Sequence, residues 1–279
     1  MRALENWVLS TALILVLPPA GLAQSSSPQP AVSPSALVRR VIANELKPQA
    51  EHSWVYNSEK EEAGKKHTKR VVQTRQGSLE RLVAVDGLPL SADKQREEAE
   101  RLEKIANHPK EWQKLEQDQK KDAEQCDAFF KMIPDAFLFN FEKREGDFIT
   151  LSFKPNPAYE SSSREAKVLH VMEGELLVHA KDERLASISG RLAEEVKFGG
   201  GLFGYLDKGG TFSVKRTEVT PGQWMMTSIN VNMNGKALFI KTIAVQQKES
   251  RSNFQELAQD ATLADAASIL NNRIVLAEK

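Results

Sequence analysis

Apolar and polar residues alternate along most of the chain between about residues 137 and 247. Phe137, Phe139 and Phe141 share one parity, and Leu151 and Phe153 continue the pattern further on. Period-two alternation is typical of strands with one apolar face and one solvated face, as in an antiparallel sheet. Such a sheet has to cover its apolar face with helices, another sheet or a lipid.

Three further strands are expected before residue 90, which brings the total to roughly nine to eleven. They are 52–58, 68–75 and 79–86. The charged segment 59–66 predicts a solvated hairpin tip, and Glu145-Gly146-Asp147 predicts a later turn. Asn234-Gly235 is the strongest hairpin signal, because a type I′ turn needs positive φ at both positions.

A highly charged segment from Ser91 to about Met132 carries one narrow apolar stripe. It predicts a long helix capped by Ser91, interrupted at Pro109 and able to lie across the apolar face as a lid. Shorter helices are expected from a cap at Ser35 to about Leu46, over 164–172, and in the tail from Phe254. The lid side chains are Leu102, Trp112, Leu115 and Phe130.

These elements predict an α+β fold. We expect a strongly curved antiparallel sheet that forms an incomplete, open β-barrel, with helices that include the insert 91–133 covering its apolar concave face. The expected organisation is a signal peptide (1–23), a disordered Ser/Pro-rich leader (24–35), the barrel domain (36–254) and a helical tail (255–279).

The N-terminus indicates export. A basic start, an apolar stretch from about Trp7 to Leu17 and small residues before the cut predict cleavage after Ala23. The apolar stretch is shorter than the roughly 20 residues of a spanning helix. Because no cysteine lies near the cut, the protein is not expected to be a lipoprotein itself. We expect a periplasmic protein without a stable transmembrane segment once the signal is removed.

The amino-acid composition argues against several classes of function. Lys plus Arg number 38 and so do Asp plus Glu, so the basic excess of a dedicated nucleic-acid binder is missing. Cys126 is the single cysteine, which excludes an intramolecular disulfide and a thiolate metal cluster. Its neighbours Phe129 and Phe130 predict a buried, inert thiol on a helix.

Local catalytic and cofactor motifs are lacking. The G-x-G-x-x-G at Gly199–Gly204 is not placed between a strand and a helix, so it predicts a glycine-rich connection between strands. The histidines form no H-E-x-x-H, and there is no G-x-S-x-G elbow. We expect no metal, no cofactor and no enzyme activity. A hydrolase in the same cavity stays an alternative, because catalytic triads are spatial.

Aromatic and aliphatic strand residues are the remaining candidates for a site. Most should form the core under the lid, and some should line an apolar cavity suited to an acyl chain. The candidate cavity residues are Trp54, Tyr56, Val83, Phe137, Phe139, Phe141, Leu151, Phe153, Phe198, Phe212 and Trp224.

Several stretches resemble a known family. They are Phe153-Lys154-Pro155-Asn156-Pro157, the run from Val168 to Leu176, Gly209-Gly210-Thr211-Phe212 and Gly222-Gln223-Trp224. With the signal peptide and helical insert, they are similar to the bacterial outer-membrane lipoprotein-sorting family of periplasmic carriers, as a divergent exported member. The resemblance implies an incomplete β-barrel closed by helices that carries lipoprotein acyl chains. The carriers' early R-P-x-x-F-x-W motif has no match, so no functional arginine is carried over.

The sequence therefore predicts a periplasmic, non-enzymatic carrier that binds a lipid or a lipoprotein acyl chain. The alternative is an envelope sensor or scaffold that uses the same fold to bind a protein partner through the polar face of the 91–125 helix. Neither reading identifies the cargo.

Overall fold

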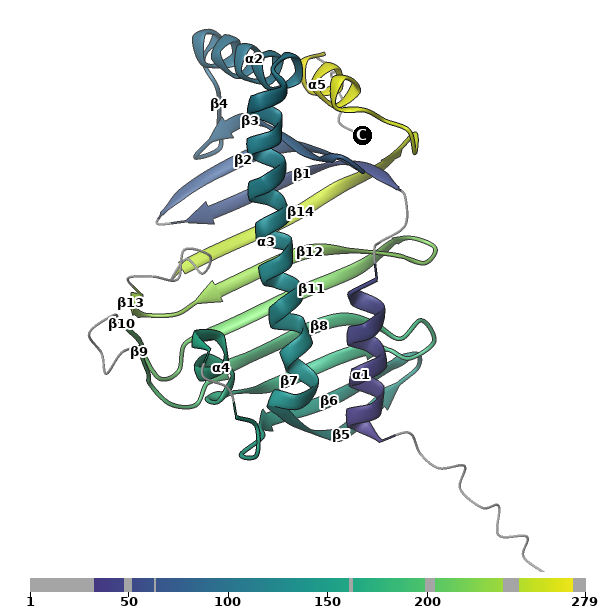
Figure 1. Cartoon of the computed structure of the whole chain (residues 1–279), viewed down its shortest axis with the longest axis vertical. Helices are drawn as coiled ribbons and strands as arrows, with labels where there is room; N and C mark the ends of the chain where they lie inside the picture. The colour runs from purple at the N-terminus through teal and green to yellow at the C-terminus, as the bar shows by residue number, and fades with distance from the viewer. Residues whose placement is uncertain are drawn as a thin grey trace, which may run out of the picture. The chain divides into compact units, whose positions relative to one another are not determined.

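The computed structural model describes residues 33–47, 52–62, 64–160, 163–198, 204–237 and 246–272. Within them lie five helices and two antiparallel sheets (Figure 1). The helices are α1 (Pro34–Glu45), α2 (Ala92–Asn107), α3 (Pro109–Ala136), α4 (Arg164–Leu169) and α5 (Leu263–Asn271).

The larger sheet has eleven strands, and the fold is α+β as predicted. In order across the sheet they are β4 (Leu88–Pro89), β3 (Gly77–Val85), β2 (Lys65–Thr74), β1 (Ser53–Glu62), β14 (Gln246–Leu257), β12 (Gln223–Asn232), β11 (Thr211–Thr220), β8 (Arg184–Leu192), β7 (Met172–His179), β6 (Phe148–Pro155) and β5 (Phe137–Glu145). The sheet is not closed, because β4 and β5 are separate edges. The smaller sheet contains β13 (Gly235–Ala237), β10 (Gly204–Leu206) and β9 (Val196–Phe198).

Cross-strand partners identify the two faces of the large sheet, because directly paired residues point the same way. One row of partners crosses the sheet from β1 to β5 and comprises Lys60, Glu249, Ile229, Val214, Ile188, Leu176, Leu151 and Phe141. We call its side the α1 face, because Val38 and Val41 of α1 are buried in one cluster with Leu176 and Ile188. The residues that alternate with this row include Val55 and Val72, which pack with α5, so we call their row the α5 face; Trp112 and Leu115 of α3 belong to the same cluster.

The N-terminal helix begins two residues earlier than predicted. Ser33, not Ser35, caps α1, and its hydroxyl accepts from the Ala36 N–H at 3.2 Å. Pro34 occupies the first helical position, where its missing N–H and fixed φ suit the helix start. The helix buries Leu37, Val38, Val41 and Ile42, as its predicted apolar side requires.

A buried carboxylate ties the end of α1 to two strands. The Glu45 side chain is 4% exposed and pairs with Arg216 of β11. It also accepts from Arg184 Nε at 3.0 Å, Arg184 Nη2 at 3.1 Å and the Leu185 N–H at 2.9 Å. Burial lowers the pKa of Arg216 to about 10, which leaves its guanidinium charged at neutral pH. The pairing supplies the counter-charge that buried ions need.

The C-terminal region differs from the predicted helical tail, because it begins with strand β14. Residues 246–257 form a strand between β1 and β12, and the helix starts only at Leu263. The helical prediction from Phe254 is wrong because this side chain packs on the β1 aromatics, with ring centroids 6.4 Å from Trp54 and 5.2 Å from Tyr56. Backbone hydrogen bonds to neighbours on both sides then hold a largely polar strand.

One turn prediction has bounds that are too wide, and another is wrong. The hairpin tip expected over 59–66 is shorter, because β1 runs to Glu62 and β2 starts at Lys65, with Gly64 in the turn at φ 77°. Lys66 pairs with Glu59 at 2.7 Å across the two strands. After β12 the chain passes into the small sheet, where β13 pairs with β10. Gly235 has φ 140°, and a Cβ there would lie 2.2 Å from the Tyr205 carbonyl oxygen, so this glycine serves a close approach and not a hairpin.

The helical insert breaks at His108–Pro109 as predicted, and Ser91 caps α2. The turn at Gly146 also joins β5 and β6 as expected. The predicted signal peptide, the leader up to residue 32 and residues 199–203 of the glycine-rich segment lie outside the described residues. No helix among the described residues has the length and apolarity needed to cross a membrane.

Replacing Glu45 by Gln should lower the free energy of unfolding by about 3 kcal/mol, because it removes the counter-charge from buried arginines. Urea denaturation measures this loss. Asp135→Asn is the matched control, since it breaks the Arg39–Asp135 pair, whose side chains are 56% and 57% exposed. That change should cost less than about 1 kcal/mol. Equal losses in the two variants would contradict a structural role for the buried pair.

Candidate functional site

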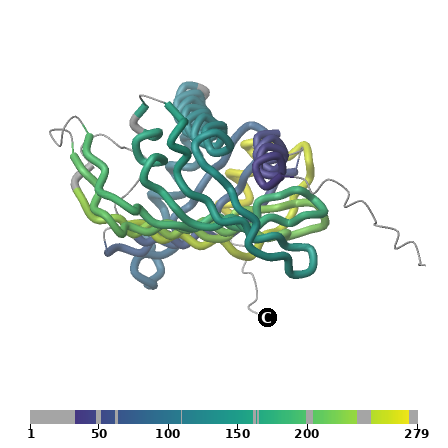
Figure 2. Tube along the Cα trace, turned by 90° about the horizontal axis from the view of Figure 1, so that it is seen from below, coloured from purple at the N-terminus to yellow at the C-terminus, as the bar shows by residue number. Residues whose placement is uncertain are grey.

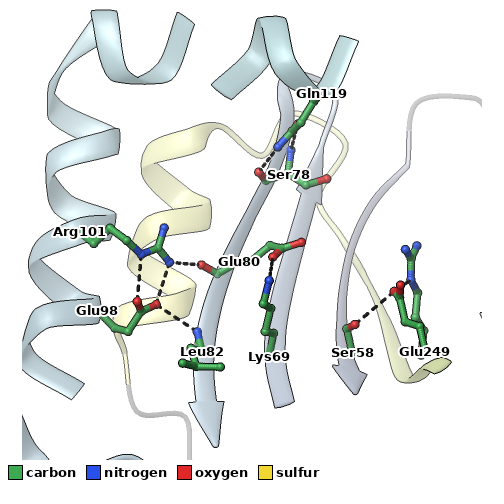
Figure 3. A network of polar contacts seen from close by, with 10 residues as sticks. Ser58, Lys69, Ser78, Glu80, Leu82, Glu98, Arg101, Gln119 and Glu249 are labelled. Carbon is green, nitrogen blue, oxygen red and sulfur yellow. Dashed lines mark hydrogen bonds and ion pairs between the residues drawn. The ribbon is translucent and has the colours of Figure 1, made fainter. Parts of the chain in front are cut away.

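Helix α3 is held to the sheet at both ends. Near its start, Gln119 Oε1 accepts from the Ser78 N–H at 3.0 Å, and Gln119 Nε2 donates to the Ser78 carbonyl at 2.8 Å (Figure 3). A Cβ on Gly77 would lie 2.8 Å from the Trp112 ring, so the indole rests directly on this glycine. At the other end, residues from Phe129 to Ala136 pack into the cluster of α1.

Helix α2 reinforces the first of these anchors. Glu98 accepts from the Leu82 N–H at 3.1 Å and from Arg101, and Arg101 donates to the Glu80 carbonyl at 2.5 Å (Figure 3). Burial raises the pKa of Glu98, but the hydrogen bonds from Arg101 and Leu82 outweigh burial and leave this pKa below its ordinary value. The carboxylate therefore stays ionised and fastens α2 to β3.

Between its anchors α3 is exposed to solvent. Every residue from 120 to 128 is exposed, whereas Gln119 and Phe129 on either side are half-buried. We call this segment the α3 bridge; it spans about two and a half turns, or about 13 Å. Helix α3 crosses the strands on the same side of the sheet as α1 (Figures 1 and 2).

The α1 face has apolar side chains that are only partly covered. They lie on β11 and β12 and are half-buried, whereas Leu176 and Ile188 of the neighbouring strands are buried. Phe212 lies against Gly190, where a Cβ would come within 3.0 Å of its ring. We call this set the apolar strip; it comprises Phe212, Val214, Ile229 and Val231.

Charged residues border the apolar strip on one side. The row partner of Ile229 is Glu249, which lies next to Lys60. Arg251 donates to Glu249 at 2.7 Å and lies over the Tyr56 ring, 5.4 Å from its centroid. Burial raises the pKa of the Tyr56 hydroxyl, and the charge of Arg251 opposes this shift. Along this face, apolar surface therefore gives way to a charged border.

Cys126 lies on the α3 bridge, and its predicted burial is wrong, because its side chain is exposed. Burial by the surrounding protein nevertheless raises the pKa of this thiol, and Asp127 adds to the shift. The two phenylalanines that suggested burial lie beyond the end of the bridge and pack into the α1 cluster.

The structure divides the predicted cavity and lid residues among several places. One cluster on the α1 face contains Phe137, Phe139, Leu151, Phe153 and Phe198, with Phe130 and Phe212 packed against it. Trp54 and Tyr56 belong to a second cluster. The lid residues Leu102, Trp112 and Leu115 pack with Val72 and Leu79, away from Phe130. Val83 and Phe141 are 39% and 56% exposed.

Trp224 belongs to a different group of side chains. Its ring and that of Phe148 each lie 5.2 Å from the His179 ring, and its Nε1 donates to Asp182 at 3.3 Å. His179 Nδ1 is buried 3.0 Å from Asp182 Oδ2 but forms no hydrogen bond with a described residue. No three His, Cys, Asp or Glu side chains within the described residues are arranged to hold a metal ion.

The chain was compared with protein-family models, curated proteins and solved structures, and no match was found in any of the three. The arrangement of the α3 bridge over the α1 face is therefore the main guide to function.

The Cys126 thiol should react with a maleimide more slowly in the folded protein than in urea at pH 8, because its raised pKa reduces the thiolate fraction. The folded rate should also keep rising at pH values where an ordinary thiol has levelled off. Labelling is specific because the chain has one cysteine. Identical pH profiles for folded and unfolded protein would contradict the raised pKa.

Proposed function

We propose that the protein is a periplasmic, non-enzymatic carrier that binds a lipid or a lipoprotein acyl chain between the α3 bridge and the apolar strip. One observation carries the proposal: a helix segment whose residues are all exposed crosses a sheet face on which the side chains of the apolar strip are only half-buried. Apolar surface that the fold itself leaves partly covered is suited to an apolar ligand.

Burial of the acyl chain would drive binding. Each methylene removed from water contributes about 0.8 kcal/mol, so a short part of a chain supplies useful affinity. The charged border at Glu249 and Arg251 would face the polar end of the ligand. The tail would then lie along β11 and β12, and the headgroup would lie toward β14 and β1.

The way α3 is anchored also supports the curved, open barrel that the sequence led us to expect. A helix fixed to the β2–β3 turn at one end and to the α1 cluster at the other follows a straight line between them. A sheet that curves away from this line leaves the middle of the helix unpacked. This arrangement agrees with the resemblance to lipoprotein-sorting carriers, and the signal peptide expected at 1–23 agrees with a periplasmic location.

A second candidate is an envelope sensor or scaffold that binds a protein through the same helix. It is favoured by the exposure of the α3 bridge, whose charged side chains include Lys120, Asp122 and Glu124. A carrier would bind its ligand on the side of the α3 bridge that faces the sheet, whereas a scaffold would bind its partner on the side that faces away from the sheet. Ligand loading should therefore protect Cys126 from labelling in a carrier and leave it unchanged in a scaffold.

The chain from Gln24 onward, purified from an export host, should retain lipid that native mass spectrometry detects at about one molecule per protein and that denaturation releases. The apolar strip provides the physical reason, since it stays partly exposed without a ligand. A ligand-free mass, together with failure to load with fatty acid, would contradict the carrier and favour the scaffold.

Ile229→Asp should weaken binding of a fluorescent stearate at least tenfold, because it places a charge in the apolar strip. Asn230→Asp is the matched control: it adds the same charge at the next residue, which is exposed on the α5 face. Circular dichroism melting should show that both variants fold. If the two variants bound the stearate equally, the apolar strip would not be the acyl site.

A further inference from the structure

A row of hydrogen-bond donors crosses the α5 face. Register pairs Arg81 of β3 with Arg70 of β2, Arg70 with Asn57 of β1, and Asn57 with Ser252 of β14. Directly paired residues are neighbours on one face. The row therefore places two guanidinium groups, an amide and a hydroxyl side by side, and it contains no carboxylate.

Arg70 of this row has a buried donor that lacks an acceptor. Its side chain is half-buried, and its Nε is buried without a hydrogen-bond partner among the described residues. Burial lowers the pKa of Arg70. Buried donors without partners are rare and costly, and a bound anion would supply the acceptor that this Nε needs.

The neighbouring Arg81 is already engaged. Its Nη1 donates to the Leu270 carbonyl at 2.6 Å and to Asn271 Oδ1 at 3.2 Å, and its Nη2 donates to the Gln95 carbonyl at 3.3 Å. These bonds fix Arg81 at the end of α5. Like charges directly opposite each other on two strands repel, so an anion at Arg70 would stabilise the pair.

We propose that Arg70 anchors a second binding site, on the α5 face, for a carboxylate or phosphate group. The planar fork of a guanidinium matches two oxygens of either group, and the nearby charge of Arg81 adds attraction. Asn57 lies directly opposite Arg70, and Thr68 lies two residues before it on the same face. Both are half-buried, and neither side chain is hydrogen-bonded to a described residue, so each can donate to the bound group.

Two sources could supply this anion. One is a small solute that carries a phosphate or carboxylate. The other is the chain itself, because α5 ends at Asn271, beside Arg81, and Glu278 follows near the end of the sequence. A competing acceptor is Glu59, which is paired with Thr68 in register and forms an ion pair with Lys66 at 2.7 Å.

Isothermal titration calorimetry with inorganic phosphate at constant ionic strength tests the site on the chain from Gln24 onward. Saturable binding is expected in the unsubstituted chain, a loss of at least tenfold in Arg70→Gln, and a partial loss in Arg70→Lys, which keeps the charge without the fork. Lys69→Gln is the matched control. It removes one positive charge from the adjacent residue, which points to the α1 face and pairs with Glu80 at 2.5 Å, and its affinity should stay within twofold.

The same titration on a chain that ends at Asn272 separates the two sources. Binding that appears only in the shortened chain, and is lost with Arg70→Gln, supports the site and assigns its natural occupant to the chain's own carboxylate. Equal binding with and without Arg70 overturns the proposal, as does no binding in either chain. Binding that appears only after Glu59→Gln also overturns it, because Glu59 is then the acceptor for Arg70. Circular dichroism confirms that each variant is folded.

Discussion

The two attachments of α3 are the constraint on which the arrangement of the α1 face depends. A continuous helix curves only gently, and a sharp bend needs a disruption of its hydrogen bonding. Once Gln119 holds one part to the β2–β3 turn and Ile133 is buried with α1, the position of every residue between them is fixed. The α3 bridge is therefore held in place by its ends, and the apolar strip stays half-buried.

Polarity changes along each face of the sheet and not only between faces. On the α1 face, the row that starts in the packed core at Leu151 and Leu176 ends at Glu249 and Lys60. On the α5 face, Val55 and Val72 pack with α5, and Arg70 lies two residues before Val72 on the same strand. Each face thus combines a stabilising apolar cluster with a neighbouring polar region that could recognise a ligand, and the two proposed sites do not compete for the same side chains.

Local patterning was sufficient for elements whose own sequence contains the signal. Alternation predicted β5 and β6, and the apolar stripe with Pro109 predicted the division between α2 and α3. It was not sufficient for β14, where Phe254 is the large apolar residue among charged and polar ones and where the stabilising partners are distant in sequence. The exposure of the α3 bridge could not be predicted either. Exposed charges on one helix face look the same in sequence whether or not the other face packs. Cys126 was misplaced for that reason.

The position of β14 has a consequence for the order in which the molecule can fold. The strands from β1 to β4 and those from β5 to β12 have no pairing with each other in the large sheet except through β14. Val55, for example, pairs with Val72 on one side and with the distant Gln255 on the other. Closing so long a loop is slow compared with forming the local hairpins. A growing chain would therefore hold two separate half-sheets with open edges, and these would join in one late step when nearly the whole sequence has become available.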